Sequence, residues 1–140
     1  MLSLSSNVRT QIVAHARQHA PVEACGYLAE KDGVVSGFFP LTNVDGATDH
    51  FTLDPAQQFA AVREMRASGY RLRAVYHSHP ATPARPSRED IRLAADPGVS
   101  YVIVSLASAE PDLKSFIIQN GIVSPEPITV VASVGAGGAR

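Results

Sequence analysis

The residues best suited to chemistry in this chain gather in one short stretch. His77 and His79 are separated by a single residue, and Asp90 follows eleven residues after the second histidine. The apolar run 72–76 before them has the length and composition of a strand, which places both imidazoles at its end and, by alternation, on one face. Their Cα atoms would then lie roughly 6.6 Å apart. Two parallel side chains at that spacing can bind one metal ion.

The residues between the second histidine and Asp90 predict a stiff loop that leads into a helix. Prolines at positions 80, 83 and 86 prevent regular strand or helix pairing. Ser87 then stands where a helix N-cap is expected, with acidic residues in the following turn. We therefore expect Asp90 one turn into a helix, with its carboxylate able to point back at the histidines.

Two imidazoles and one carboxylate form a ligand set that suits zinc. Three protein ligands leave a position for water, as in catalytic zinc sites, whereas a structural site uses four protein ligands. A His-x-His pair taken alone is equally compatible with two solvated side chains at a strand end. Ser87 is likewise compatible with an ordinary helix cap. On residue types alone, both interpretations stay open.

The complete spacing is more specific, because His-x-His, seven residues, Ser, two residues and Asp resembles the signature of the JAMM (MPN-plus) zinc metallopeptidases. This resemblance implies Zn²⁺ on His77, His79 and Asp90. It also implies a glutamate at the start of an upstream strand, which Glu23 matches, acting as general base. Ser87 would donate a hydrogen bond to the tetrahedral oxyanion while its oxygen caps the helix. No position of the catalytic motif departs from the family pattern.

The same resemblance implies the fold and its extent. We expect an α/β protein with one domain, in which a mixed β-sheet is flanked by helices in the cytidine deaminase-like JAB1/MPN arrangement. The domain should span residues 1–132, and the Gly- and Ala-rich residues 133–140 should form a flexible tail. A Gly137-Gly138 pair in this tail is similar to the diglycine that such peptidases cleave after, but we interpret it as coincidence.

Composition limits the classes of partner. The 140 residues suit one domain, and 12 Lys and Arg against 13 Asp and Glu, with a pI near 6.5, provide no basic field for nucleic acid or a membrane surface. The single cysteine excludes an internal disulfide and fits a reducing compartment. No segment reaches the ~20 apolar residues of a membrane span. We expect a cytoplasmic protein.

The remaining elements follow from periodicity and turn residues. Helices are expected from the caps at 5–7 to about Ala20, from Asp54-Pro55 with Phe59, Val62 and Met65 on the apolar face, and from Ser87 to about 95. The expected strands are 24–30 and 34–41, joined by an Asp-Gly turn, then 72–79, 99–106, 113–119 and 128–131. A short extended segment, 122–123, should follow 113–119 after an Asn-Gly hairpin turn. The nearly all-apolar run 99–106 should be the centre of the sheet, parallel to 72–79.

Other candidate side chains have simpler interpretations. His15 and His19 are four residues apart on a helix, but Ala16 stands where the zincin motif has its glutamate, so we expect surface or helix-edge histidines. Cys25 is expected to be a small buried residue. His50 should be solvated or line the cleft.

The functional expectation comes from the resemblance to compact prokaryotic members of the family. It implies a peptidase or isopeptidase that cuts a peptide, isopeptide or cysteine adduct after the C-terminal Gly-Gly of a ubiquitin-like sulfur-carrier protein. The alternatives are a non-catalytic MPN scaffold, which would have lost ligands or the glutamate, and a cell-wall peptide hydrolase. A zinc deaminase is excluded because the Pro-Cys-x-x-Cys element is missing. An extended substrate should lie along a sheet or loop edge.

Overall fold

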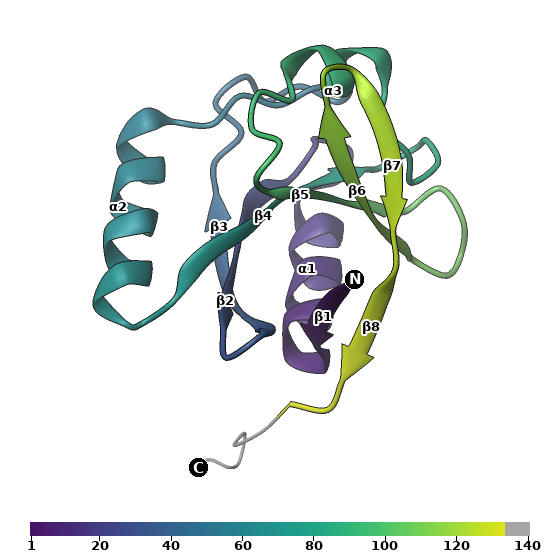
Figure 1. Ribbon diagram of the computed structural model, residues 1–140. Coiled ribbons are helices and arrows are strands. Elements are labelled where there is room, and N and C mark those ends of the chain that lie inside the picture. Colours follow the sequence, from purple (N-terminus) through teal and green to yellow (C-terminus); the bar gives the residue numbers. More distant parts are fainter. Residues whose placement is uncertain (134–140) are drawn as a thin grey trace.

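The computed structural model describes residues 1–133, and one eight-stranded mixed sheet runs through them in the order β7-β6-β5-β4-β2-β3-β1-β8 (Figure 1). The elements in chain order are β1 (Leu2–Ser5), α1 (Ser6–His19), β2 (Cys25–Lys31), β3 (Val34–Leu41), α2 (Pro55–Ala67), β4 (Arg71–His79), α3 (Arg88–Leu93), β5 (Ser100–Ser105), β6 (Asp112–Gln119), β7 (Ile122–Glu126) and β8 (Ile128–Val131). The expected α/β fold with a mixed sheet flanked by helices is confirmed.

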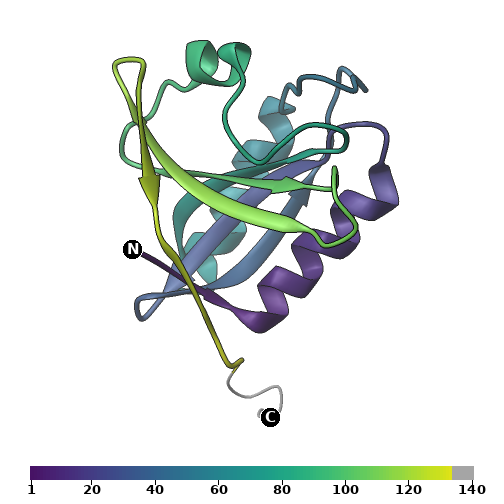
Figure 2. The ribbon, with the colours of Figure 1, turned by 90° about the vertical axis from the view of Figure 1, so that its right-hand side faces the viewer.

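Helices α1 and α2 cover opposite faces of the sheet (Figure 2). Helix α1 starts at Ser5, whose hydroxyl accepts a hydrogen bond from the Val8 amide at 3.2 Å, and it buries an apolar stripe that includes Ile12 and Ala16. Helix α2 starts as its sequence predicts, with Asp54 as the cap and Pro55 in the first turn. These helices shield the central strands from water on both sides, which holds the end of β4 in place.

The packing face of α2 differs from the expected one. Ala61 and Met65 are buried, whereas Phe59 is 67% exposed. Phe59 lies roughly 120° around the helix from Met65, because each residue turns the helix by about 100°. The phenyl ring instead lies near the Arg63 guanidinium, 5.7 Å from ring centroid to Cζ. The apolar face of α2 is therefore narrower than its apolar sequence suggested.

Strand β4, not β5, occupies the middle of the sheet together with β2. It pairs antiparallel with β2 and parallel with β5, so the expected parallel crossover between 72–79 and 99–106 is confirmed. Strand β5 is still an inner strand, and its side chains Val102, Ile103 and Val104 are fully buried. The carboxyl end of β4 lies beneath α3, at the top of the view in Figure 1.

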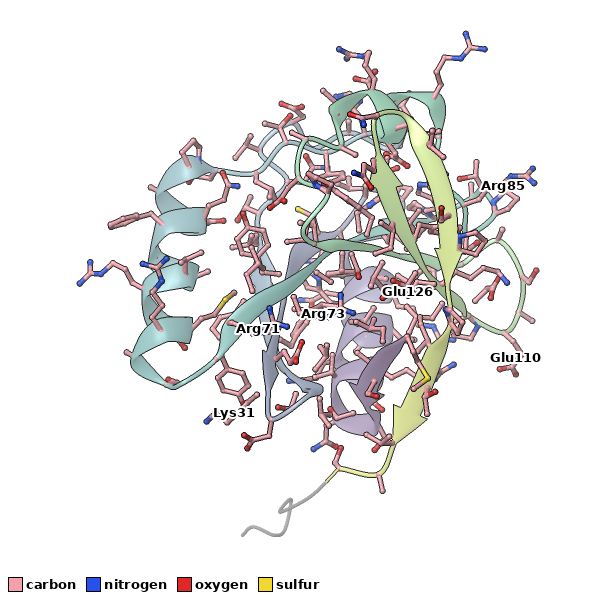
Figure 3. All side chains as sticks on the ribbon, in the orientation of Figure 1. Lys31, Arg71, Arg73, Arg85, Glu110 and Glu126 are labelled. Carbon is pink, nitrogen blue, oxygen red and sulfur yellow. The ribbon has the colours of Figure 1, made fainter. Side chains whose placement is uncertain are left out.

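Two strands at the sheet margins extend beyond the sequence expectation. Strand β1 pairs in parallel with β8 and with β3, and β7 continues to Glu126 rather than ending at Val123. Glu126 anchors β7 through a buried polar cluster: its carboxylate accepts hydrogen bonds from Ser100 at 2.6 Å and Ser115 at 2.7 Å, and lies 3.0 Å from Arg73 (Figure 3). Pairing partners distant in sequence define these strands.

The C-terminal end of the described chain is attached to α1. The Ser133 hydroxyl accepts a hydrogen bond from the Asn7 amide at 2.8 Å and lies 3.0 Å from the Ser6 hydroxyl. The rest of the expected tail, including Gly137-Gly138, lies outside the described residues. Within residues 1–133, no helix combines the length and the apolar character needed to cross a membrane.

Candidate metal centre

His77, His79 and Asp90 converge in the structure. The two Nε2 atoms are 3.1 Å apart, and each is also 3.1 Å from Oδ2 of Asp90, so the three atoms form a nearly equilateral triangle. Within residues 1–133, this is the one group of three or more His, Cys, Asp or Glu side chains with its potential ligand atoms gathered in this way. All three side chains are more than nine-tenths buried.

Strand pairing positions the histidines, and a cap positions the aspartate. His77 is opposite Cys25 of β2 and Ile103 of β5, which fixes the end of β4 on both sides. Ser87 and Asp90 form a capping box: the Ser87 hydroxyl accepts from the Asp90 amide at 3.0 Å, and Asp90 Oδ2 accepts from the Ser87 amide at 2.9 Å. The same carboxylate oxygen that closes the box faces the imidazoles.

These donors fit a zinc ion by size and by chemistry. Ligand atoms at 2.0–2.1 Å from a tetrahedral zinc lie roughly 3.3 Å from one another, close to the observed triangle. Nδ1 of His79 lies 2.8 Å from the Pro83 carbonyl oxygen, so Nδ1 carries the proton and Nε2 presents its lone pair to the triangle. The ring of His77 is held by stacking against Phe51, with 4.7 Å between centroids. Its Nδ1 is buried and has no hydrogen-bond partner within residues 1–133.

The electrostatics favour the metal-binding forms of Asp90 and His77. For His79, burial lowers the pKa, but the Asp90 carboxylate and the Pro83 carbonyl outweigh burial and raise it. Burial opposes ionisation of Asp90, but its contacts with the His77 and His79 rings and the hydrogen bond from the Ser87 amide prevail and hold its pKa well below the usual range. Burial lowers the pKa of His77. At neutral pH the aspartate is therefore ionised and His77 is neutral. A carboxylate and a neutral imidazole are the protonation states that a metal ligand requires.

Glu23 lies in the segment that leads into β2 and is only 3% exposed. Its Oε1 is buried without a hydrogen-bond partner in the part of the chain that the structure describes, and burial raises the pKa of its carboxyl group to about 7. The field of His79 opposes this shift and that of Asp90 adds to it. A carboxylate with a pKa near neutrality can both accept and return a proton at physiological pH.

The backbone at Glu23 is fixed by the loop 43–52. The Glu23 amide donates to the Ala47 carbonyl at 2.9 Å, and the Glu23 carbonyl accepts from the Asn43 side chain at 3.1 Å. The Asn43 amide group also donates to the His50 carbonyl, at 3.0 Å. Asn43 therefore organises the loop 43–52 beside Glu23. No local motif marks this role, because the partners of Asn43 are backbone groups brought close by the fold.

The metal centre opens into a cavity of about 440 Å³ between α2 and α3. His77, Asp90 and His50 line the end near the triangle, and the floor is formed by side chains of β4 and β5. Apolar and aromatic side chains make up most of this cavity wall, among them Tyr27, Phe51, Leu53, Leu72, Val75, Leu93, Tyr101 and Ile103. An extended chain with apolar side chains fits such a groove.

The remaining candidate residues have defined surroundings. Cys25 is fully buried, and burial raises the pKa of its thiol to about 12, which agrees with a packing role. His15 is half-buried, its Nδ1 lies 2.6 Å from the Tyr76 hydroxyl, and burial lowers its pKa to about 4. His19 is exposed, as expected. His50 lies 2.9 Å from Asp49 at the rim of the cavity.

Comparison with known proteins places this geometry in a family. Residues 5–119 match the model of prokaryotic homologs of the JAB domain. The CysO-cysteine peptidase of Mycobacterium tuberculosis is 37% identical over 134 residues, which cover 94% of this chain and 92% of the relative. The desampylase of Haloferax volcanii is 34% identical over 111 residues, or 74% of this chain and 80% of the relative.

A solved structure agrees with these relatives. Protein DSY2949 from Desulfitobacterium hafniense superposes with a TM-score of 0.89 and 44% sequence identity, covering 98% of this chain and 97% of that protein. The family match spans most of the chain, and it includes Glu23, Ser87 and the three potential metal ligands. The chain therefore belongs to the prokaryotic JAB domain family, with the JAB1/MPN fold that the spacing of its histidines, serine and aspartate had indicated.

Proposed function

We propose that this protein is a zinc-dependent peptidase that hydrolyses a peptide or isopeptide bond. The observation that carries the proposal is the buried triangle of His77, His79 and Asp90 beside a glutamate whose Oε1 has no hydrogen-bond partner among residues 1–133. Structural zinc sites have four protein ligands, and three leave room for a reactant. Peptidase names among its relatives support the same class.

Each residue of the site has a distinct task. His77, His79 and Asp90 would hold zinc, which supplies Lewis acidity that makes water a nucleophile near neutral pH and polarises a carbonyl group. Glu23 accepts a proton from water and then delivers it to the leaving nitrogen as the C–N bond breaks. Ser87 positions Asp90 through the capping box, and its hydroxyl hydrogen is free for an oxyanion because the hydroxyl accepts, and does not donate, in the cap.

For the substrate, we propose a ubiquitin-like sulfur-carrier protein that is cut after its C-terminal Gly-Gly. The names of the M. tuberculosis and H. volcanii relatives, a CysO-cysteine peptidase and a desampylase, support this substrate class. Two glycines can pass the crowded triangle, and the residues before them can occupy the apolar cavity. Both edges of β4 are already paired, so the extended tail would align with the segments 50–53 and 80–87 rather than add to the sheet at β4.

The carrier body should contribute to binding. Ordering a flexible tail in the cleft costs conformational entropy, and contacts of a folded body outside the cleft can offset that cost. We therefore expect higher kcat/KM on an intact carrier than on the isolated tail peptide. A scaffold role does not require an unpartnered buried glutamate, and burying one is unfavourable, so the catalytic proposal accounts for Glu23 better.

The test uses purified sulfur carriers extended by one residue beyond Gly-Gly, incubated with the zinc-loaded protein and followed by intact-mass spectrometry. Loss of that residue from the intact carrier, with slower cleavage of the free tail peptide, is the expected result. Glu110→Gln is the control variant, because Glu110 is exposed in the turn before β6 (Figure 3). Equal rates on carrier and free tail would refute docking of the body. Absence of cleavage with every carrier would refute the proposed substrate class.

A further inference from the structure

A second, smaller cavity lies on the other side of Glu23. It has a volume of about 210 Å³ and is bordered by the end of α1, the segment before β2 and the end of β3. It shares no lining residue with the 440 Å³ cavity: Glu23 lines only the smaller one, whereas His77 and Asp90 line only the larger one. The proposed base and the potential metal ligands thus stand between two separate spaces.

We propose that this second cavity receives the amine half of the bond that is cut, and that it restricts this half to a single small residue. The inference rests on the peptidase function proposed above. Hydrolysis places the hydroxyl of water on the carbonyl carbon and a proton on the departing nitrogen. Because Glu23 delivers that proton within hydrogen-bond reach, the departing residue must lie beside Glu23. Of the two cavities, the smaller one meets this requirement.

The walls of the second cavity are fixed by packing. Leu41 and Pro40 are held in register with Cys25 and Gly26 of β2. On the α1 side, the Tyr76 hydroxyl bonds to His15. The His15 ring also packs edge-on against Phe38, with 5.5 Å between centroids. Widening the cavity would break these contacts, so a large departing residue cannot be accommodated cheaply.

The side chains at the cavity suit a small polar residue. His15 is neutral at pH 7, and its Nδ1 is paired with the Tyr76 hydroxyl, so only its Nε2 is left for a bound residue. His19, the last residue of α1, forms an exposed part of the wall, 4.6 Å from the His15 ring between centroids. Thr42 lies opposite, at the end of β3, and is exposed. His19 can therefore be exchanged without disturbing the core.

The experiment varies the departing residue and the size of the cavity together. The substrates are carriers ending in Gly-Gly-Gly, Gly-Gly-Cys and Gly-Gly-Phe. Each is incubated with the zinc-loaded parent, with His19→Trp and with His19→Ala, and kcat/KM is measured for every combination of carrier and protein. His19→Trp should narrow the cavity and lower the ratio of kcat/KM for the Phe carrier to kcat/KM for the Gly carrier by about 10-fold or more. His19→Ala should widen the cavity and raise this ratio. Ala60→Trp is the matched control, because it adds the same ring at an exposed position of α2.

A second readout does not depend on turnover. In the zinc-loaded protein, titration with free cysteine should shift the NMR signals of the His15 and His19 rings, and His19→Trp should weaken this binding. If the parent cleaves carriers but neither His19 variant changes the preference relative to Ala60→Trp, the cavity assignment is wrong while the proposed function stands. If the parent cleaves no carrier, the proposed function fails. Cysteine that shifts neither ring contradicts the cavity assignment directly.

Discussion

Glu23 shows how burial can prepare a side chain for chemistry at a cost in stability. The residue is 3% exposed, and its Oε1 has no hydrogen-bond partner among the described residues. A carboxylate in such surroundings lacks the hydrogen bonds that water would provide, so its neutral form is favoured. The resulting pKa of about 7 suits proton transfer but opposes folding when the group is ionised.

This cost predicts a pH-dependent effect of Glu23→Gln on the metal-free protein. The pKa rises from 4.5 in the unfolded chain to about 7 in the folded one. Between these values the folded state binds the extra proton, so the free energy of unfolding falls as pH rises through this window. Glutamine cannot ionise, so at pH 8 the variant should be more stable than the parent, by on the order of 3 kcal/mol at most.

Urea unfolding in the presence of a chelator, at pH 5 and at pH 8, measures the effect. The stability difference between Glu23→Gln and the parent should be small at pH 5 and large at pH 8. Glu110→Gln controls for the loss of one exposed negative charge. A difference that does not change with pH would show that Glu23 has an ordinary pKa in the folded protein.

At the scale of elements, the short helix α3 depends on its first turn. It has six residues, buries none of them fully, and begins with the capping box of Ser87 and Asp90. Isolated helices of this length are unstable in water, so the cap and the preceding proline-rich loop must hold it. Because Asp90 Oδ2 belongs to both the cap and the triangle, the order of α3 and the metal affinity are coupled.

Ser87→Ala should therefore affect metal binding as well as stability. Loss of the cap should cost about 1 kcal/mol, and the less constrained Asp90 should weaken zinc binding by roughly 10-fold or more. If Ser87 also donates to the oxyanion, kcat at saturating zinc should fall by about 10² to 10³-fold. Ser87→Thr keeps the hydroxyl and should restore both properties. Zinc affinity is measured by competition with a chelator. An unchanged affinity in Ser87→Ala would show that the helix cap does not influence metal binding.

At the scale of the whole molecule, the sequence predicts those features that depend on neighbouring residues alone. Capping residues predict the helix starts at Ser5 and Asp54. Turn residues predict the Asp32-Gly33 turn, and alternation of side chains predicts the end of β4. Spacing over fourteen residues was enough to indicate that His77, His79 and Asp90 meet. The structure brings these three atoms within 3.1 Å of one another, which agrees with that expectation.

The features that the sequence does not predict depend on contacts between residues far apart along the chain. Strand β1 has four residues and exists because β8 and β3 flank it. The exposure of Phe59 depends on which face of α2 meets the sheet. The bond between His15 and Tyr76 joins residues 61 positions apart. Such features follow from the assembled sheet, and no window of local sequence contains them.

The most direct test of the central claim is to measure zinc content and cleavage rate in the same preparations of parent, Glu23→Gln and His77→Ala. The parent should bind one zinc per chain and lose activity with a chelator. Glu23→Gln should keep its zinc and lose about 10² to 10⁴-fold in rate, whereas His77→Ala should lose both. Full activity in metal-free parent, or parental activity in Glu23→Gln, would contradict the assignment of the triangle as metal site and of Glu23 as base.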